Sequence, residues 1–181
     1  MDTMSEFDRA VAGCRGIFAA KLADYGASWR IMRPRSVTDQ IFIKAKRIRS
    51  VETKGRTAVG EGILPEFKAI VNYAIIGIIQ LREGYSDTID TDADRAAELY
   101  DGIAAEARAL LERKNHDYDE AWRQMRVSSY TDFILTKTER VKEIEDNGGA
   151  VRVSEGIDSN YFDILVYAVF GIIKLTECPQ E

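Results

Sequence analysis

The 181-residue chain has few of the residues that build disulfide or zinc sites. It contains two cysteines, Cys14 and Cys178, and one histidine, His116, at spacings that match no familiar zinc pattern. A disulfide framework and a catalytic zinc site are therefore disfavoured, and a reducing cytoplasm is the expected location. His116 corresponds to Ala23 in the repeat described below, which indicates a surface histidine outside any shared site.

Long apolar runs and an excess of positive charge are also missing. The most apolar stretches, residues 69–81 and 164–175, are about a dozen residues long, whereas a bilayer core needs about 20. We therefore expect buried core helices, no secretory signal and no membrane partner. The net charge of −5 disfavours extended nucleic-acid binding but leaves room for a local basic pocket. With 45% hydrophobic residues and only three prolines, the chain is globular.

An internal duplication organises the sequence. Residues 21–55 match residues 114–148 at 15 of 35 positions, and residues 60–83 match residues 154–177 at 11 of 24 positions. Such self-similarity marks a repeated structural unit. We place repeat 1 at residues 1–84 and repeat 2 at residues 85–181. Each copy is too small to bury its apolar third helix alone, so the two are expected to share one core.

Each repeat is predicted to contain three helices, which makes the fold all-α. Apolar residues recur at spacings of three and four from Phe7 to Leu22 and from Ile103 to Leu111, the pattern of an amphipathic helix. No strand-length run alternates cleanly. Two homologous three-helix units favour a pseudo-two-fold helical bundle that resembles a fused homodimer.

Several residues predict where the helices begin. Ser36 and Ser129, each followed three residues later by aspartate, resemble caps of the second helices. Pro65 suits the first turn of a third helix that runs to about Glu83. The remaining predicted starts are Asp90 or Asp92 for the fourth helix, and Asp158 or Ser159 for a last helix that runs to about Glu177.

Two glycines lie in the middle of the predicted third helices. Gly77 and Gly171 occupy matching positions, and a mid-helix glycine costs about 1 kcal/mol relative to alanine. One explanation is a close helix crossing at the pseudo-dyad. The alternative is a glycine tolerated in a helix that is stabilised elsewhere.

Cations recur at matching positions and are candidates for binding phosphate. Lys44 and Arg47 lie three residues apart on one helix face, where both side chains can reach one phosphate. The alternative is a solvated helix face with salt bridges to neighbouring aspartates. The candidate cations are Lys44, Arg47, Lys137, Arg140, Arg123 and Arg126, with Arg30 and Arg33 as the repeat 1 copies of the last two.

Each repeat has a tryptophan close to an Asp-Tyr pair. Trp29 and Trp122 are candidates for stacking on a nucleobase because a flat aromatic lies near guanidinium groups. Burial in the core is the alternative. Asp117 and Tyr118 precede Trp122 and are included among the candidate nucleotide contacts.

Carboxylates gather where the third helix of each repeat begins. Glu155, Asp158 and Asp163 are the candidate catalytic and metal-binding residues of repeat 2, and Glu61 and Glu66 are the candidate ligands of repeat 1. Acidic residues about one helical turn apart suit Mg²⁺, which needs carboxylate oxygens and open positions for phosphates. Acids in a first turn also stabilise the helix dipole without any metal.

Five motifs of repeat 2 carry a family resemblance, and they are Lys114-Asn115-His116-Asp117-Tyr118, Trp122-Arg123-x-Met125-Arg126, Lys137-x-x-Arg140-Val141, Ser154-Glu155 and Asp163-Ile164-x-x-Tyr167-Ala168. Together they resemble the nucleotide-modification-associated domain 1 family, and the motifs of repeat 1 resemble it less closely. Repeat 1 has Leu64 and Ala69 where the family pattern expects acids. The resemblance implies a role connected with nucleotides.

A weaker resemblance links the last helix to the MazG-like all-α nucleoside triphosphate pyrophosphohydrolases. The acidic helix start followed by Asp163-Ile164-x-x-Tyr167-Ala168 is similar to their metal-binding helix. That resemblance implies Mg²⁺ held by carboxylates and cleavage of an α–β phosphate bond. The Glu-x-x-Asp element of that group is present only in halves, as Glu66-x-x-Ala69 and Asn160-x-x-Asp163.

These observations support three hypotheses about function. The first is a protein that binds a nucleotide or another phosphorylated small molecule, with Mg²⁺-dependent pyrophosphohydrolysis or an accessory role in nucleotide modification as its enzymatic forms. The second is a non-catalytic helical binding or scaffold module with a degenerate metal site. The third is local nucleic-acid binding through Arg30, Arg33 and Arg35, which the net acidity disfavours. A homodimer is left open.

Overall fold

The computed structural model describes residues 2–55, 62–150 and 155–177. Within these ranges the chain forms six α-helices and two short 3-10 helices, with no strand. The prediction of an all-α fold with three long helices per repeat is confirmed. The elements are α1 (Thr3–Tyr25), η1 (Ser28–Ile31), α2 (Pro34–Lys54), α3 (Leu64–Glu83), α4 (Ala93–Tyr118), η2 (Ala121–Gln124), α5 (Val127–Asp146) and α6 (Ile157–Glu177).

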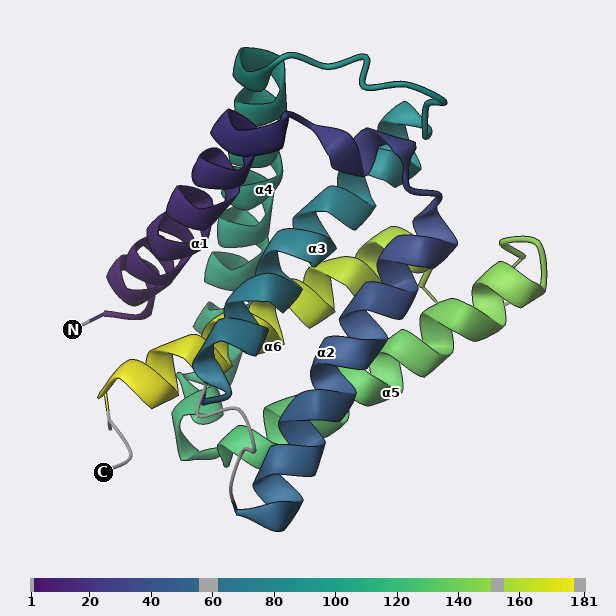
Figure 1. Ribbon diagram of the computed structural model, residues 1–181. Helices are drawn as coiled ribbons and strands as arrows, with labels where there is room; N and C mark the ends of the chain where they lie inside the picture. Colours follow the sequence, from purple (N-terminus) through teal and green to yellow (C-terminus); the bar gives the residue numbers. More distant parts are fainter. Residues whose placement is uncertain (1, 56–61, 151–154, 178–181) are drawn as a thin grey trace.

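The helices form three layers, and each layer pairs the corresponding helices of the two repeats (Figure 1). The apolar helices α3 and α6 make the central layer and have the most extensive contact of any pair. Helices α1 and α4 cover one side of this layer, and α2 and α5 cover the other. One buried apolar cluster draws residues from all six helices, so the core extends across both repeats.

Several helix starts differ from those expected. Helices α2 and α5 begin at Pro34 and Val127, two residues before Ser36 and Ser129, and no side chain caps either helix. The predicted serine caps are wrong because these serines already lie inside the first turn. In α2 the fixed φ of proline makes Pro34 a good first residue without any hydroxyl cap.

The other helix boundaries follow the sequence more closely. The carboxylate of Asp92 accepts a hydrogen bond from the Arg95 backbone N–H and caps α4, as predicted. Helix α3 has Pro65 in its first turn and ends at Glu83, as predicted. Helix α6 ends at Glu177 but begins at Ile157, so Asp158 lies in its first turn and is not its cap.

Gly77 and Gly171 lie where α3 and α6 cross, which confirms the close approach suggested by the sequence. A Cβ atom added to Gly77 would lie 2.8 Å from the ring of Tyr161, and one added to Gly171 would lie 2.7 Å from the ring of Phe67. Phe67 and Tyr161 themselves occupy equivalent positions of the two repeats. Each repeat therefore inserts one aromatic ring against the glycine of the other, as expected at a pseudo-two-fold axis.

The apolar character of α3 is explained by its place in the central layer. Among the described residues, α3 is the one helix whose length and apolar composition would allow it to cross a membrane. However, 67% of its most apolar window is buried inside the fold. The same burial applies to the apolar face of α6, where Ile164, Leu165 and Ala168 are fully buried.

Helices α2 and α5 meet through reciprocal polar contacts. The buried hydroxyl of Thr38 donates a hydrogen bond to Glu145 at 2.7 Å, and the equivalent Thr131 donates to Glu52 at 2.9 Å. Burial raises the pKa of both glutamates, while the threonine bonds act in the opposite direction. Only the Thr38 side has a third member, the Tyr161 hydroxyl at 2.6 Å from Thr38 Oγ1, because repeat 1 has Phe67 in that place.

This asymmetry gives a testable prediction about stability. Thr38→Val keeps the side-chain shape but leaves both Glu145 and the buried Tyr161 hydroxyl without a partner, so the free energy of unfolding should fall by about 1 kcal/mol. Thr131→Val is the matched control, because it removes the bond to Glu52 and involves no tyrosine. Each threonine also loses a longer bond to a backbone carbonyl four residues earlier in its helix. Urea unfolding of the two variants should show the larger loss for Thr38→Val. An equal loss would mean that the tyrosine contact contributes nothing.

Candidate functional site

The structure contains two cavities at equivalent places in the two repeats, each of about 600 Å³. Cavity 1 lies between α1, η1, α2 and α3, and cavity 2 lies between α4, η2, α5 and α6. Their volumes fall in the range of small-molecule sites. The polar and aromatic lining of cavity 1 is Phe18, Lys21, Tyr25, Ser28, Trp29, Lys44, Glu66, Lys68, Asn72 and Tyr73. That of cavity 2 is Lys114, Asn115, Asp117, Tyr118, Trp122, Phe133, Phe162, Asp163, Tyr167 and Phe170.

The two cavities share most of their aromatic wall. Tyr25, Trp29 and Tyr73 of cavity 1 correspond to identical residues in cavity 2, and Met32 corresponds to Met125. Burial raises the pKa of Tyr73 and of its counterpart Tyr167, so both phenols stay neutral and can donate hydrogen bonds at neutral pH. The duplication thus repeats three aromatic residues of the pocket as well as the fold.

The 3-10 turns that carry the tryptophans are held by the central helices. In repeat 1 the Gln80 amide donates hydrogen bonds to the backbone carbonyls of Trp29 and Arg30, both at 3.0 Å. In repeat 2 the equivalent residue is Lys174, whose ammonium group donates to the carbonyl of Arg123 at 2.7 Å. Each tryptophan is therefore fixed in place by a buried or half-buried polar side chain of α3 or α6.

Both tryptophans are buried, as the alternative considered from the sequence expected, and each also lines a cavity. Their stacking on a nucleobase stays a prediction. Trp122 stacks on Phe170 with ring centroids 4.2 Å apart and carries the Arg123 guanidinium 4.5 Å from its ring centre. These groups cannot share one face at such distances, so both faces of the Trp122 indole are covered. The indole N–H of Trp29 and that of Trp122 are buried and have no hydrogen-bond partner among the described residues.

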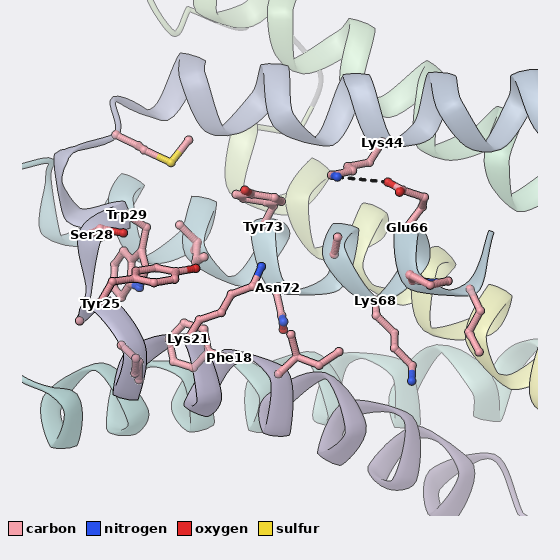
Figure 2. Close-up of a pocket in the computed structure, with 18 residues that line it drawn as sticks. Phe18, Lys21, Tyr25, Ser28, Trp29, Lys44, Glu66, Lys68, Asn72 and Tyr73 are labelled. Atoms are coloured by element: carbon pink, nitrogen blue, oxygen red, sulfur yellow. Dashed lines mark ion pairs between the residues drawn. The ribbon is translucent and has the colours of Figure 1, made fainter. Parts of the chain in front are cut away.

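Cavity 1 is rich in positive charge. Its lining contains three lysines and one acidic residue, Glu66. Glu66 is shared by Lys44 at 3.3 Å and Arg47 at 2.5 Å, and no carboxylate in the described part of the chain pairs with Lys21. Figure 2 shows Lys21 extending from α1 and Lys44 from α2 toward the same space beside Tyr73. One carboxylate therefore faces several ammonium and guanidinium groups.

Cavity 2 contains its own counter-charge. Asp163 forms ion pairs with Lys114 and Lys137, the counterparts of Lys21 and Lys44, and both N···O distances are 2.9 Å. Burial would raise the pKa of Asp163, but its hydrogen bonds to the two ammonium groups lower it below the ordinary value. Burial would lower the pKa of Lys114, and its bond to Asp163 raises it. The cluster of these three side chains carries a net charge of +1.

The acidic residues expected to bind Mg²⁺ are not gathered. Both oxygens of Asp163 face ammonium groups, Glu155 and Asp158 are exposed, and Glu66 pairs with Lys44 and Arg47. Glu61 lies outside the described residues. In the described part of the chain, no three acidic, histidine or cysteine side chains come close enough to hold a metal ion. These residues therefore do not fit the predicted metal site.

Several of the candidate cations serve the fold. Arg123 is held by Glu6 at 2.5 Å, Glu120 at 2.7 Å and Glu177 at 3.6 Å, so it does not face the cavity as a phosphate ligand. Arg140 pairs with Glu143 at 3.2 Å, and Arg47 pairs with Glu66. These arginines form salt bridges, the alternative considered from the sequence, and their phosphate roles stay a prediction.

The arginines near η1 do not form one basic patch. Arg30 is only 5% exposed and donates to the carboxylate of Asp90 at 2.9 Å and to the carbonyl of Gly84 at 2.6 Å. Arg35 pairs with Asp146 at 2.7 Å, whereas Arg33 and the equivalent Arg126 are exposed. Arg30 is therefore buried and cannot contact nucleic acid, which weakens the hypothesis of nucleic-acid binding through this cluster.

The remaining candidates lie at the mouth of cavity 2. Tyr118 is 71% exposed, and Asp117 is exposed beside His116, whose Nδ1 is 3.4 Å from its carboxylate. Sequence reasoning missed Lys21, Lys114, Tyr73 and Tyr167 as site residues. Their identity between repeats was visible, and it marks the lysines on α1 and α4 that complete each cavity.

Comparison with known proteins gives one family. A family model described as nucleotide modification associated domain 1 matches residues 21–81 and again residues 114–175. Neither a curated protein nor a solved structure matches the chain significantly. The two matched segments contain both cavities except for a few residues at their edges.

Proposed function

Since the chain belongs to the nucleotide modification associated domain 1 family, which it matches in two tandem copies, we propose that it binds a nucleotide in cavity 1. The observation that carries this proposal is the composition of the cavity wall. It combines aromatic rings and several lysines within one space of about 600 Å³. A nucleotide has a matching flat base and phosphates.

The aromatic end of cavity 1 suits a base. Tyr25 and Tyr73 offer ring faces for stacking, which contributes about 1–3 kcal/mol per base in single-stranded nucleic-acid complexes. The Trp29 ring adds a third aromatic side chain to this end of the cavity.

The lysine end suits the phosphates. Lys21 has no carboxylate partner among the residues that the structure describes, and Lys44 shares Glu66 with Arg47, so a phosphate gains charge-assisted hydrogen bonds without breaking a complete ion pair. Lysine binds phosphate as a mobile point charge and tolerates phosphate groups in several positions. The cavity therefore supports binding of nucleoside mono-, di- or triphosphates.

Binding without hydrolysis has more support than Mg²⁺-dependent pyrophosphohydrolysis. The carboxylates that would hold the metal point to different partners, and Asp163 already faces two lysines. This arrangement agrees with the second hypothesis, a non-catalytic binding module with a degenerate metal site. A role as an accessory protein in nucleotide modification is compatible with binding alone.

The proposal predicts that Lys21→Ala weakens nucleotide binding about tenfold, because one charge-assisted phosphate contact contributes roughly 1.5 kcal/mol or more. Isothermal titration calorimetry with a panel of deoxynucleoside mono-, di- and triphosphates measures the affinity. Lys46→Ala is the matched control, since this lysine lies on α2 but outside the cavity lining. The affinity should also fall with added salt.

Two results would count against nucleotide binding. One is a wild-type protein whose melting temperature no nucleotide in the panel raises at millimolar concentration. The other is an equal loss of affinity in Lys46→Ala and Lys21→Ala, which would assign binding to the general surface charge and not to cavity 1.

A further inference from the structure

The charge of the two cavities differs most clearly at one position of the central helices. Position 163 of α6 carries the aspartate between Lys114 and Lys137, and the equivalent position of α3 is Ala69. Both lysines have identical counterparts in repeat 1. Lys114 and Lys137 therefore share a carboxylate at this position, whereas repeat 1 has a methyl group there and its Lys44 pairs instead with Glu66 at 3.3 Å.

The Asp163 carboxylate marks where an anion fits between these lysines. Each of its oxygens lies 2.9 Å from a different ammonium group, which is the geometry of a charge-assisted hydrogen bond. Asp163 is only 17% exposed, so its charge is largely shielded from water. The side chain occupies the place that a phosphate oxygen would take in an equivalent cavity without it.

The other charged groups of the linings reinforce this difference. Cavity 1 is lined by Lys21, Lys44, Lys68 and Glu66, which leaves it net positive. Cavity 2 is lined by Lys114, Asp117 and Asp163, and Lys137 pairs with Asp163, so these four groups carry no net charge. Cavity 1 therefore presents a more positive potential to an incoming anion than cavity 2 does.

We propose that only cavity 1 binds the anionic group of the ligand, between Lys21 and Lys44, and that Asp163 closes cavity 2 to anions as a built-in counter-ion. This inference rests on the proposed function for the identity of the ligand but not for the anion site itself. The duplicated protein accordingly has two homologous pockets but one phosphate site, and that site lies in repeat 1. The family resemblance, which is closer for repeat 2, favoured the opposite assignment.

A pair of reciprocal substitutions tests the inference with inorganic pyrophosphate as the probe. Ala69→Asp places the carboxylate of repeat 2 into cavity 1, and calorimetry should show at least a tenfold loss of pyrophosphate affinity. Asp163→Ala opens cavity 2, and the stoichiometry should rise from one pyrophosphate per chain to two. Asp163→Ala should also have a lower melting temperature than the wild type at low salt, because Lys114 and Lys137 then face each other without a counter-ion.

Added pyrophosphate should restore the melting temperature of Asp163→Ala, which a purely structural role of the aspartate does not explain. Asp163→Asn keeps the side-chain shape and serves as the second variant if the alanine variant is poorly folded. A wild-type stoichiometry of two, an unchanged stoichiometry in both Asp163 variants, or undiminished binding in Ala69→Asp would overturn the inference. Pyrophosphate binding to cavity 1 without any nucleotide binding would contradict the proposed function and leave the anion site standing.

Discussion

Arg123→Met is expected to lower the free energy of unfolding by about 3 kcal/mol at neutral pH, the largest loss among the variants considered. The guanidinium of Arg123 contacts Glu6, Glu120 and Glu177, which come from three separate parts of the chain. Glu6 is only 7% exposed and has no other cation within ion-pair distance in the described residues. Removing the arginine leaves a shielded carboxylate charge next to two others.

The loss should depend on pH in a definite direction. Burial opposes ionisation of Glu6, but its bond to Arg123 lowers its pKa, and the same arginine lowers the pKa of Glu120 to about 2. A carboxyl whose pKa is lower in the folded than in the unfolded protein stabilises the fold at pH values above its unfolded pKa. This stabilisation is lost as the pH falls through the pKa of the folded protein. The neighbouring Glu6 raises the pKa of Glu177. In Arg123→Met all three carboxyls repel, so the deficit is greatest near pH 7 and shrinks toward pH 4.

Urea unfolding at pH 7 and at pH 4 measures both effects. Arg126→Met is the matched control, because this arginine lies three residues further on and is exposed. Its substitution should change the stability by about 0.5 kcal/mol or less at either pH. A loss in Arg123→Met of the same size at both pH values would mean that the methylene packing of the arginine against Trp122 matters more than its charge.

The duplication made the fold predictable from the sequence. Matching apolar periods located all three helices of each repeat, and the paired glycines correctly indicated the crossing of α3 and α6. The serine capping pattern predicted the wrong helix starts at Ser36 and Ser129, because the backbone there is already helical and needs no hydroxyl cap. The short turns η1 and η2 were not predicted, since long-range bonds from Gln80 and Lys174 hold them.

The candidate site was predictable only in part. Identical residues in the two repeats correctly pointed to lysines and tryptophans around one region. They did not separate Lys44, which lines cavity 1, from Arg47 and Arg123, which pair with carboxylates. A sequence shows which charges are repeated but not which partner each charge meets in space. For the same reason Asp163 was predicted as a metal ligand, although two lysines from other helices surround it.

Gly171→Ala is the second substitution with a large expected effect, and it tests the pseudo-dyad itself. The added Cβ would lie 2.7–2.9 Å from three ring carbons of Phe67, closer than real Cβ contacts allow. Phe67 is fully buried, so its ring has no free space to move into. Overpacking of this kind costs about 1–3 kcal/mol and outweighs the helix propensity that alanine gains over glycine. We expect a net loss of about 1–2 kcal/mol in the free energy of unfolding.

Gly102→Ala separates this clash from helix propensity. Gly102 is exposed on α4, and an added Cβ there meets nothing within 4 Å, so the substitution should stabilise the protein by about 0.5–1 kcal/mol. Thermal and urea unfolding should therefore move in opposite directions for the two variants. Phe67→Leu in the Gly171→Ala background removes the ring atoms that clash and should recover part of the loss, although either substitution alone destabilises. If Gly171→Ala were as stable as Gly102→Ala, the close crossing of α3 and α6 would have to be abandoned.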